Sequence, residues 1–563
     1  MTGGLLNIVS YGNQNIILNS NPKKSFFKTT YAKYTNFGMQ KFRIDFTGQR
    51  NLRMSEESRF TFTVPRYAEL LMDTYLVVTL PTIWSPIYPP IACSDVWHPY
   101  EFRWIENLGT QMIKEVVFSV GGQTLQRVTG KHLLAQVQRD FNGTKRLLYD
   151  AMTGNTAELN DPANYSGRKG TYPNAYYNTS QQGPEPSIRG RKLYIPLNAW
   201  FCNNSRAAFP LVALQYNELQ IDVIMRPVRE LFVTRDVTYK ASTPAQVAQA
   251  PFIQPNFNEP EYQFYRFLQP PPGADITTAD MYSDKRTDWN ADVHLLSTYC
   301  FLSAEESRVF ASQEQKYLLK EAYEWEFKNI TGSHRVELQN TMGMVATWMF
   351  MFQRSDINLR NQWSNYTNWP YANVIPADVV LASGTGTYKN PCPPPKPVNI
   401  GPGVEPDGTT ATGLYVTQNY SVENQQEILQ QLGILLNGAY RENMLESGVY
   451  NYVEKYIRTM GYAPFGLYIY NFGLDASNAA YQPSGAINMS KFSTIELEFS
   501  TTPPPLDPSA NFYTICDPET GIPVGVNKPH WRIYQYNYDL TVLEERYNVI
   551  TFIGGNCALM YAR

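Results

Sequence analysis

Two pairs of glutamates have a spacing that could support acid–base chemistry. Glu324 and Glu326, and likewise Glu496 and Glu498, are separated by one residue, so both members of a pair face the same side of a β-strand. Paired carboxylates hydrolyse glycosidic bonds when one donates a proton and the other acts as base or nucleophile. Acidic residues at this spacing are far more common on the solvated face of a sheet. We interpret both pairs as solvated strand faces and assign no catalytic residue.

Histidine and cysteine, the side chains that most often bind transition metals, are scattered along the sequence. The histidines share no metal-ligand spacing, and the cysteines lie far apart without a C-x-x-C pair. We expect structural or surface histidines, free thiols, no metal site and no cofactor. The residues concerned are His98, His132, His294, His334 and His530, and Cys93, Cys202, Cys300, Cys392, Cys516 and Cys557.

A phosphate loop and a nucleophile elbow are also missing. Gly130-Lys131 fails as a phosphate loop because Leu125 stands at the position of the first glycine and His132 at that of the Ser/Thr. No G-x-S-x-G elbow occurs. The sequence therefore predicts a protein that is not an enzyme.

N-x-[ST] triplets are frequent, as expected by chance in a chain rich in Asn, Ser and Thr. N-glycosylation requires a secretory context, and residues 1–6 lack a basic segment followed by a long apolar run. The triplets are therefore no evidence for function. The triplets start at Asn142, Asn164, Asn178, Asn203, Asn329, Asn365, Asn419 and Asn488, of which Asn142, Asn164, Asn178, Asn365 and Asn419 are retained as candidate glycosylation positions.

A basic and aromatic segment, residues 21–37, stands out near the N-terminus. It reads NPKKSFFKTTYAKYTNF, and lysines interleaved with large aromatic rings argue against burial in the chain's own core. We expect an arm that packs along a neighbouring surface. Such an arm could also stack on single-stranded nucleic acid, but a net charge of -3 makes direct nucleic-acid binding the weaker interpretation. The assigned arm residues are Asn21, Pro22, Phe26, Phe27, Lys28, Tyr31, Tyr34, Asn36 and Phe37.

Composition predicts an all-β protein of more than one domain. The chain has 563 residues, 14% aromatic and 17% charged residues, 35 glycines and 39 prolines, a profile typical of short strands joined by turns. No stretch approaches the roughly 18 apolar residues of a transmembrane helix. Together with the missing signal peptide, this predicts synthesis in the cytosol.

The order of strands and turns occurs twice. In the first half, the turn Gly121-Gly122 is followed by the apolar strands 193–197 and 219–225; in the second, Asn437-Gly438 is followed by 466–470 and 495–499. Two such units fit two tandem antiparallel jelly rolls better than propeller blades or solenoid repeats.

Boundaries follow from this duplication. We expect an N-terminal arm over 1–40, a first jelly roll over 41–302, a connecting helix over 303–315 and a second jelly roll over 316–563. Ser303 is the expected N-cap, because Glu305 and Glu306 follow it in the first turn. Long loop insertions are expected near 81–107, 140–190, 227–290 and 365–420; the polar stretch 140–190 is typical of an exposed insertion, and 365–420 should lie on the outside.

Four blocks of sequence resemble the major capsid proteins of large icosahedral nucleocytoplasmic DNA viruses, a double jelly-roll family. The blocks are 21–37, FPLVALQY at 209–216, YQPSGAINMS at 481–490, and the C-terminal stretch from Tyr547 through Gly554-Gly555 to Arg563. They occur in the family's order across nearly the whole chain, whereas the insertions could not be matched.

The resemblance implies a structural capsid protein that trimerises into pseudo-hexagonal capsomers tiling an icosahedral virion. It further implies contacts with neighbouring capsomers, penton and minor capsid or cement proteins, an internal membrane reached through minor proteins, and assembly in a cytoplasmic virus factory. Two alternatives stay open from the residues alone: a carbohydrate-binding β-sandwich protein, whose tyrosines stack on sugars, and a two-jelly-roll glycan hydrolase.

Overall fold

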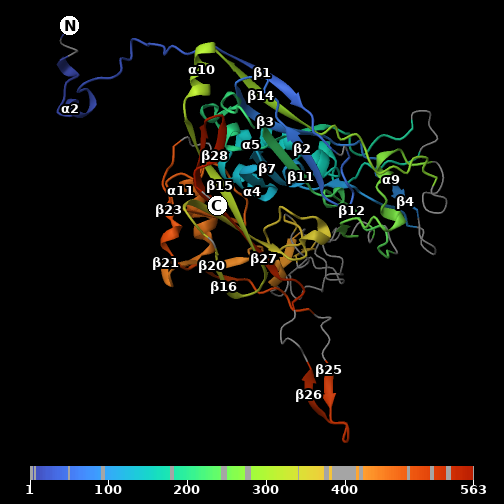
Figure 1. The fold of residues 1–563 in the computed structure, drawn as a ribbon. Coiled ribbons are helices and arrows are strands. Elements are labelled where there is room, and N and C mark those ends of the chain that lie inside the picture. Colours follow the sequence, from blue (N-terminus) through green and yellow to red (C-terminus); the bar gives the residue numbers. More distant parts are fainter. Residues whose placement is uncertain are drawn as a thin grey trace.

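Two β-sandwiches stand beside each other in the computed structural model of the chain, with an N-terminal arm and a projecting hairpin at opposite ends (Figure 1). The structure describes all residues except 1–3, 5–7, 49–50, 90–95, 178–182, 242–246, 248–249, 273–280, 340, 373, 375–378, 383–413, 418–421, 478–481, 508–512, 528–533 and 562–563.

The first sandwich has two facing sheets. One has the order β1-β14-β3-β10, with β9 also paired to β3, and the other the order β2-β11-β7-β8. Their strands are β1 (Phe37–Ile44), β2 (Ser58–Thr63), β3 (Leu70–Thr79), β7 (Ile113–Val120), β8 (Gln123–Thr129), β9 (Lys192–Pro196), β10 (Phe209–Pro210), β11 (Leu219–Met225) and β14 (His294–Leu302).

The second sandwich repeats this arrangement. Its sheets have the orders β15-β27-β17-β22 and β16-β24-β20-β21, with β23 beside β17 and β28 beside β27. The strands are β15 (Gln315–Ile330), β16 (Ser333–Glu337), β17 (Met344–Arg354), β20 (Leu429–Leu436), β21 (Ala439–Glu446), β22 (Leu467–Asn471), β23 (Ile487–Asn488), β24 (Ile495–Thr501), β27 (Tyr538–Ile553) and β28 (Asn556–Leu559).

Equivalent strands occupy equivalent places in the two sandwiches. The orders β1-β14-β3-β9 and β15-β27-β17-β22 correspond one to one, as do β2-β11-β7-β8 and β16-β24-β20-β21. The hairpin β7–β8 turns at Gly121-Gly122 and the hairpin β20–β21 at Asn437-Gly438, all four with positive φ, as the right-handed twist of a two-residue hairpin requires. The predicted double jelly roll is confirmed.

Alternating side chains build each core. In β24, Ile495, Leu497 and Phe499 are buried and the residues between them are half-exposed, which is the period-2 pattern of a strand with one face inward. Each sandwich encloses a hydrophobic cluster, and the cluster of the first extends to Leu319, Ile550 and Phe552 of the second.

Short helices connect and cover the sheets. They include α2 (Asn15–Leu18), α3 (Leu108–Met112), α4 (Gly130–Asp140), α5 (Gly143–Thr153), α6 (Ala157–Asn160), α7 (Trp200–Asn203), α9 (Tyr265–Leu268), α10 (Ala304–Ser312) and α11 (Glu454–Arg458). None of the helices in the described part of the chain is long and apolar enough to cross a membrane.

Two expected segments have different ends in the structure. The connecting helix α10 covers only 304–312, and its N-cap Ser303 accepts a hydrogen bond from the Glu306 amide. Strand β1 pairs with β14 from Phe37 onward, so residues 37–40 belong to the first sheet and the free arm ends at Asn36.

The insertions of the first jelly roll contain strands, helices and buried residues, and the expectation that 140–190 is exposed is wrong for part of that segment. Strands β4 (Ile87–Tyr88), β5 (His98–Pro99), β6 (Arg103–Trp104), β12 (Phe232–Arg235) and β13 (Phe252–Ile253) lie in them. Phe102 stacks on Phe232, with ring centroids 4.5 Å apart, and packs against Phe267. These rings are fully buried, so the insertions near 81–107 and 227–290 share one aromatic core. The insertion near 140–190 forms α5 and α6 and buries Tyr149 and Leu159.

The two ends of the molecule differ. At one end lie the arm, helix α10 and short turns, where the Gln215 amide donates to the Gly555 carbonyl. At the other end the hairpin β25–β26 (Tyr513–Cys516 and Pro523–Asn527) projects away from the sandwiches (Figure 1). Strands β18 (Val379–Ala382) and β19 (Leu414–Thr417) pair within the insertion near 365–420, most of which lies outside the described residues.

Candidate assembly surfaces

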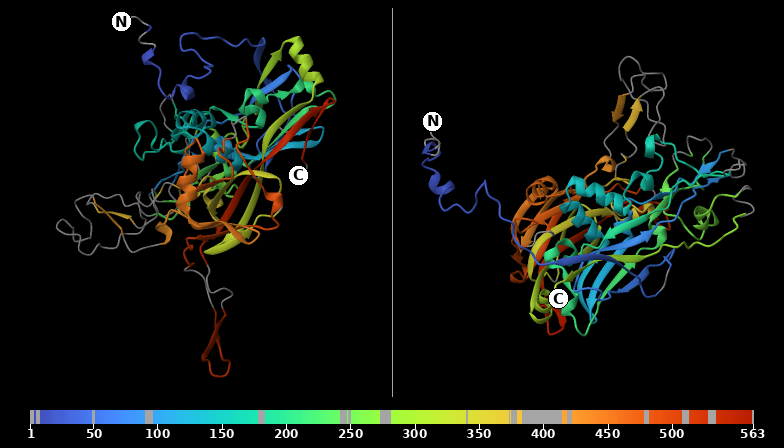
Figure 2. Two further views of the ribbon diagram at one scale, coloured as in Figure 1. Left: turned by 90° about the vertical axis from the view of Figure 1, so that its left-hand side faces the viewer. Right: turned by 90° about the horizontal axis from the view of Figure 1, so that it is seen from above.

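The N-terminal arm extends away from the sandwiches. Figure 2 shows it leaving the body from the start of β1 in both views. Its aromatic side chains are largely exposed, from 72% at Tyr11 to 100% at Phe27. Lys23, Lys24, Lys28 and Lys33 are exposed as well. Covering aromatic surface of this kind with another protein surface is favourable, because it removes the rings from water.

Helix α4 joins the two sandwiches. Thr129 caps its N-terminus by accepting from the His132 amide. The apolar face of α4 packs onto the first sandwich through Leu133, while Ala135 lies in a cluster with Met349, Met351 and Leu543 of the second. The helix from one jelly roll therefore fills the space beside the outer face of β17 and β27 in the other.

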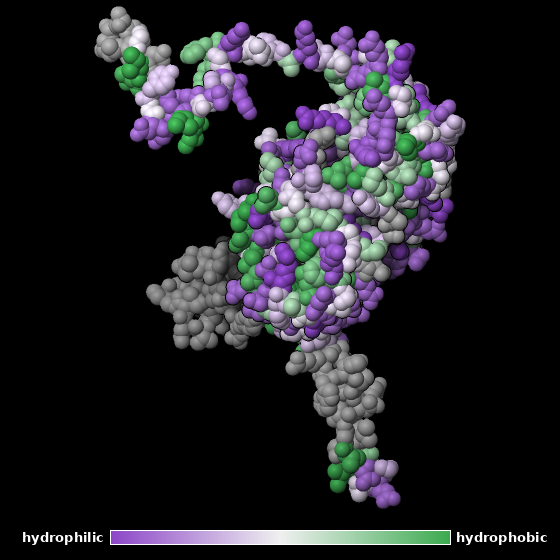
Figure 3. All heavy atoms as spheres, turned by 60° about the vertical axis from the view of Figure 1, so that its left-hand side comes forward, coloured by the Kyte–Doolittle hydropathy of each residue, from purple (hydrophilic) through white to green (hydrophobic). Residues whose placement is uncertain are grey.

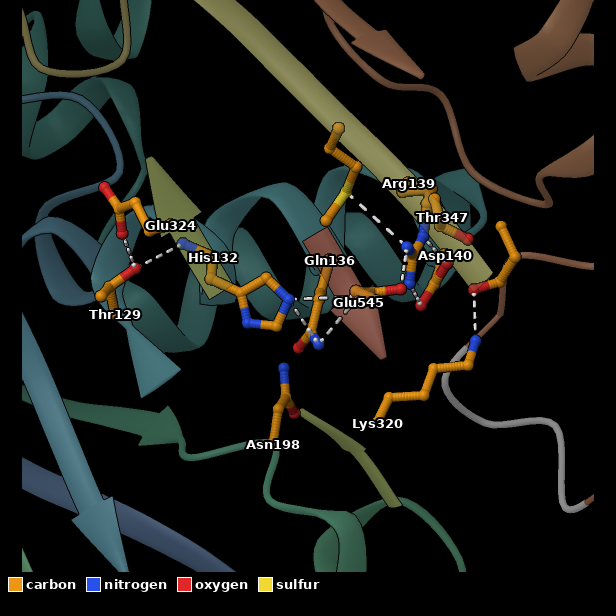
Figure 4. A network of polar contacts seen from close by, with 12 residues as sticks. Thr129, His132, Gln136, Arg139, Asp140, Asn198, Lys320, Glu324, Thr347 and Glu545 are labelled. Carbon is orange, nitrogen blue, oxygen red and sulfur yellow. Dashed lines mark hydrogen bonds and ion pairs between the residues drawn. The ribbon is translucent and has the colours of Figure 1, made fainter. Parts of the chain in front are cut away.

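A buried ionic network holds this contact (Figure 4). Arg139 Nη1 donates to Glu545 Oε2 at 2.7 Å, His132 Nε2 lies 3.1 Å from Glu545 Oε1, and Gln136 Nε2 donates to the same oxygen at 3.3 Å. Burial by itself would raise the pKa of Glu545, but Arg139, His132 and Lys320 outweigh it and hold this pKa well below its usual range. Glu545 is thus an anion in the folded protein.

The two glutamate pairs differ: Glu324 and Glu326 contact the start of helix α4, whereas Glu496 and Glu498 lie half-exposed on the outer face of β24, as the sequence predicts. Glu324 accepts a hydrogen bond from Thr129 Oγ1 at 2.9 Å, and Glu326 pairs with Lys131 Nζ at 2.6 Å. Both acids therefore bind the start of α4, because that helix covers this part of β15. In the other pair, Glu496 pairs with Arg335, and Glu498 accepts from the Tyr440 hydroxyl at 2.8 Å.

Histidines and cysteines have mixed environments. His98, His132 and His294 are buried and His334 is exposed, while His530 lies outside the described residues. Cys202, Cys300, Cys516 and Cys557 are free thiols, and Cys93 and Cys392 lie outside the described part. Within the described part, no group of three or more His, Cys, Asp and Glu side chains could hold a metal ion.

The candidate glycosylation positions differ in how far they are exposed to solvent. Asn142 is exposed and caps α5 by accepting from the Lys145 amide, and Asn164 is exposed too. Asn365 is buried and donates to the Trp369 carbonyl, so the folded chain cannot present it to a glycosylating enzyme. Asn178 and Asn419 lie outside the described residues.

The role of α4 between the jelly rolls could not be predicted from the sequence, although a helix at this place has a local signal. The N-cap Thr129 and the apolar residues Leu133, Leu134 and Val137 are a local helix signal. Nothing in the sequence links Arg139 to Glu545, because 406 residues separate them.

Two jelly rolls in one chain, joined by a buried helix and extended by a free arm, define a double jelly-roll protein built to be covered by neighbours. Comparison with known proteins identifies the family. Residues 25–283 match the family described as major capsid protein N-terminus, and residues 306–557 match large eukaryotic DNA virus major capsid protein. The chain belongs to the major capsid proteins of large eukaryotic DNA viruses.

Individual relatives agree with this assignment. The major capsid protein of Chrysochromulina ericina virus is 30% identical over 343 residues, covering 57% of this chain and 52% of the relative. The match thus spans about half of that relative's length. The major capsid protein of Paramecium bursaria Chlorella virus 1 is 23% identical over the full length of both chains. The Faustovirus major capsid protein has a similar fold, with a TM-score of 0.58 at 13% identity over 93% of this chain and 92% of the other.

Proposed function

We propose that this protein is the principal building block of an icosahedral virion shell. Three copies would form a trimer of six jelly rolls with a pseudo-hexagonal outline, a shape that tiles a flat facet. The repeat of the sheet orders β1-β14-β3-β9 and β15-β27-β17-β22 in one chain carries this proposal. Two similar units per chain give threefold assembly a nearly sixfold outline.

The two ends of the molecule differ in the way that the inner and outer sides of a shell would require. The arm and short turns lie at one end, and the insertions that carry β4 and α9, together with the β25–β26 hairpin, lie away from it. In the proposed capsomer the short-turn end faces the interior and the insertions face the exterior. The role is structural, without enzymatic activity.

The arm fastens each capsomer to its surroundings. Its exposed rings, such as Phe26 and Phe27, are positioned to pack under a neighbouring capsomer, and its lysines to meet acidic groups there. Penton and minor capsid or cement proteins are the further partners, with contact to an internal membrane through minor proteins. Assembly takes place in the host cytoplasm, at a virus factory.

Native mass measurement of the purified full-length chain tests this function. The proposal expects a stable species at three times 64.3 kDa, and imaging of particles containing the chain should show hexagonal tiles. A stable monomer that binds glycans would contradict the proposal and favour a carbohydrate-binding β-sandwich.

A further inference from the structure

One helical segment presents an apolar face to solvent. The π-helical turn Val449–Val453 continues into α11, and Tyr452, Val453, Tyr456 and Ile457 recur along one side. Their exposed fractions run from 48% at Val453 to 90% at Tyr456. Figure 3, which brings the α11 side of the molecule forward, shows apolar side chains gathered on this flank. A surface helix ordinarily turns such a stripe inward, so this one fits a protein partner.

The internal duplication indicates which partner. Helix α4 lies between strands β8 and β9 of the first jelly roll, and α11 lies between the equivalent strands β21 and β22 of the second. Helix α4 is covered because it packs on the outer face of β17 and β27 of the next jelly roll in the chain. Among the described residues, no equivalent jelly roll packs on the exposed side of α11.

A second copy of the chain supplies that jelly roll. In a closed ring of three copies, the second jelly roll of one copy is followed by the first jelly roll of the next. In the first jelly roll, β3 and β14 occupy the positions that β17 and β27 occupy in the second jelly roll. Their outer faces carry Tyr75 and Leu296, paired in register and half-exposed, as Met349 and Leu543 are paired in the covered case.

Charge complementarity supports the same docking. The last turn of α4 carries Arg139, which reaches Glu545, and the last turn of α11 carries Arg458. On the receiving face, Asp73 and Tyr75 line a cavity of about 360 Å³, together with Leu148 and Met152 of α5 and with Asp140 and Met460 of the same copy. Among the described residues, no ion pair or side-chain hydrogen bond is found for Asp73 or Arg458.

We propose that the α11 stripe of each copy packs on the outer face of β3 and β14 of the next copy, with Arg458 opposite Asp73, and that this contact closes the trimer. The inference rests on the proposed trimeric function and names the surfaces that form it. In this proposal the contact between two copies has the same arrangement as the contact between α4 and the second jelly roll within one copy.

Charge reversal in the full-length chain tests the pairing. Arg458→Asp and Asp73→Arg should each raise the concentration at which trimers dissociate by about 30-fold or more, because like charges then meet in a desolvated contact. The double variant should recover to within a few-fold of the wild-type chain. Mass photometry over a dilution series measures this. A double variant no better than either single variant would overturn the pairing.

Substitution in the stripe gives a second, independent measurement. Ile457→Asp should dissociate the trimer, while Ile522→Asp in the β25–β26 hairpin, at similar exposure, should leave it intact. Ile457 is 58% exposed, so the monomeric variant should keep its melting temperature. If all these variants remain trimers as stable as the wild-type chain, this interface is wrong and the capsomer proposal stands. If the wild-type chain never forms trimers, both fall.

Discussion

Arg139 and Glu545 form an ion pair 2.7 Å long in which both side chains are completely buried. One belongs to the first jelly roll and the other to the second, so the pair joins the two halves of the chain (Figure 4). Burial by itself would lower the pKa of Arg139, but Asp140 and Glu545 raise it, so the guanidinium stays charged. The contact between the jelly rolls therefore has a fixed geometry.

Removing one member of this pair should be costly. Arg139→Met leaves the Glu545 carboxylate buried without its main partner, which should destabilise the chain by about 3–5 kcal/mol. Urea unfolding of the purified protein measures this. Lys316→Met is the matched control, since Lys316 pairs with Glu314 at the surface, and its loss should cost about 0–1 kcal/mol. Equal effects of the two substitutions would contradict a structural role for the buried pair.

Stability should fall in acid because of Glu545. The pKa of Glu545 is lower in the folded chain than in the unfolded chain, so the unfolded state binds a proton first as pH decreases. Its contribution is complete above the unfolded carboxyl pKa of about 4.3 and is lost as pH falls from there toward the folded pKa. Urea midpoints between pH 7 and 3 should decline less steeply in Glu545→Gln than in the wild-type chain. Parallel curves would show that another carboxyl dominates.

The arm should be dispensable for folding only up to Asn36. Deleting residues 1–36 should leave the melting temperature and the trimer unchanged but weaken assembly beyond the trimer, because no sheet residue is lost. Deleting residues 1–44 removes β1, which pairs with β14 along its whole length and buries Ile44. That deletion should lower the melting temperature by more than about 5 °C. Unfolding of the shorter deletion would place the arm in the core instead.

A glycine at the start of α4 should be irreplaceable. A Cβ on Gly130 would lie 2.0 Å from the Ile113 carbonyl oxygen and 2.8 Å from that of Thr110, so Gly130→Ala should cost about 2–3 kcal/mol through displaced backbone. Gly143 begins α5 with nothing within 4 Å of its Cβ position. Gly143→Ala should therefore be neutral or stabilising by about 0.5 kcal/mol. Thermal unfolding of both variants checks the contrast, and a neutral Gly130→Ala would show that α4 can shift.

Local patterns in the sequence were sufficient for the double jelly roll. Alternating apolar residues such as Ile495, Leu497 and Phe499 predict strands, and Asn437-Gly438 predicts a hairpin, since both signals depend only on neighbouring residues. The order of these signals revealed the duplication, and the arm at 21–36 was visible because its composition excludes self-burial. The aromatic core of the insertions was missed, because Phe102, Phe232 and Phe267 come from segments without regular spacing.

Tertiary structure alone decided how the two halves meet. The sequence by itself determined that two similar units follow each other, but the burial of Glu545 beside Arg139, and the contact of Glu324 with Thr129, depend on where α4 lies across the second sheet. The same packing covers α4 and leaves the equivalent face of α11 open. Contacts between residues hundreds of positions apart follow from the packing of sheets and helices, which no local pattern in the chain encodes.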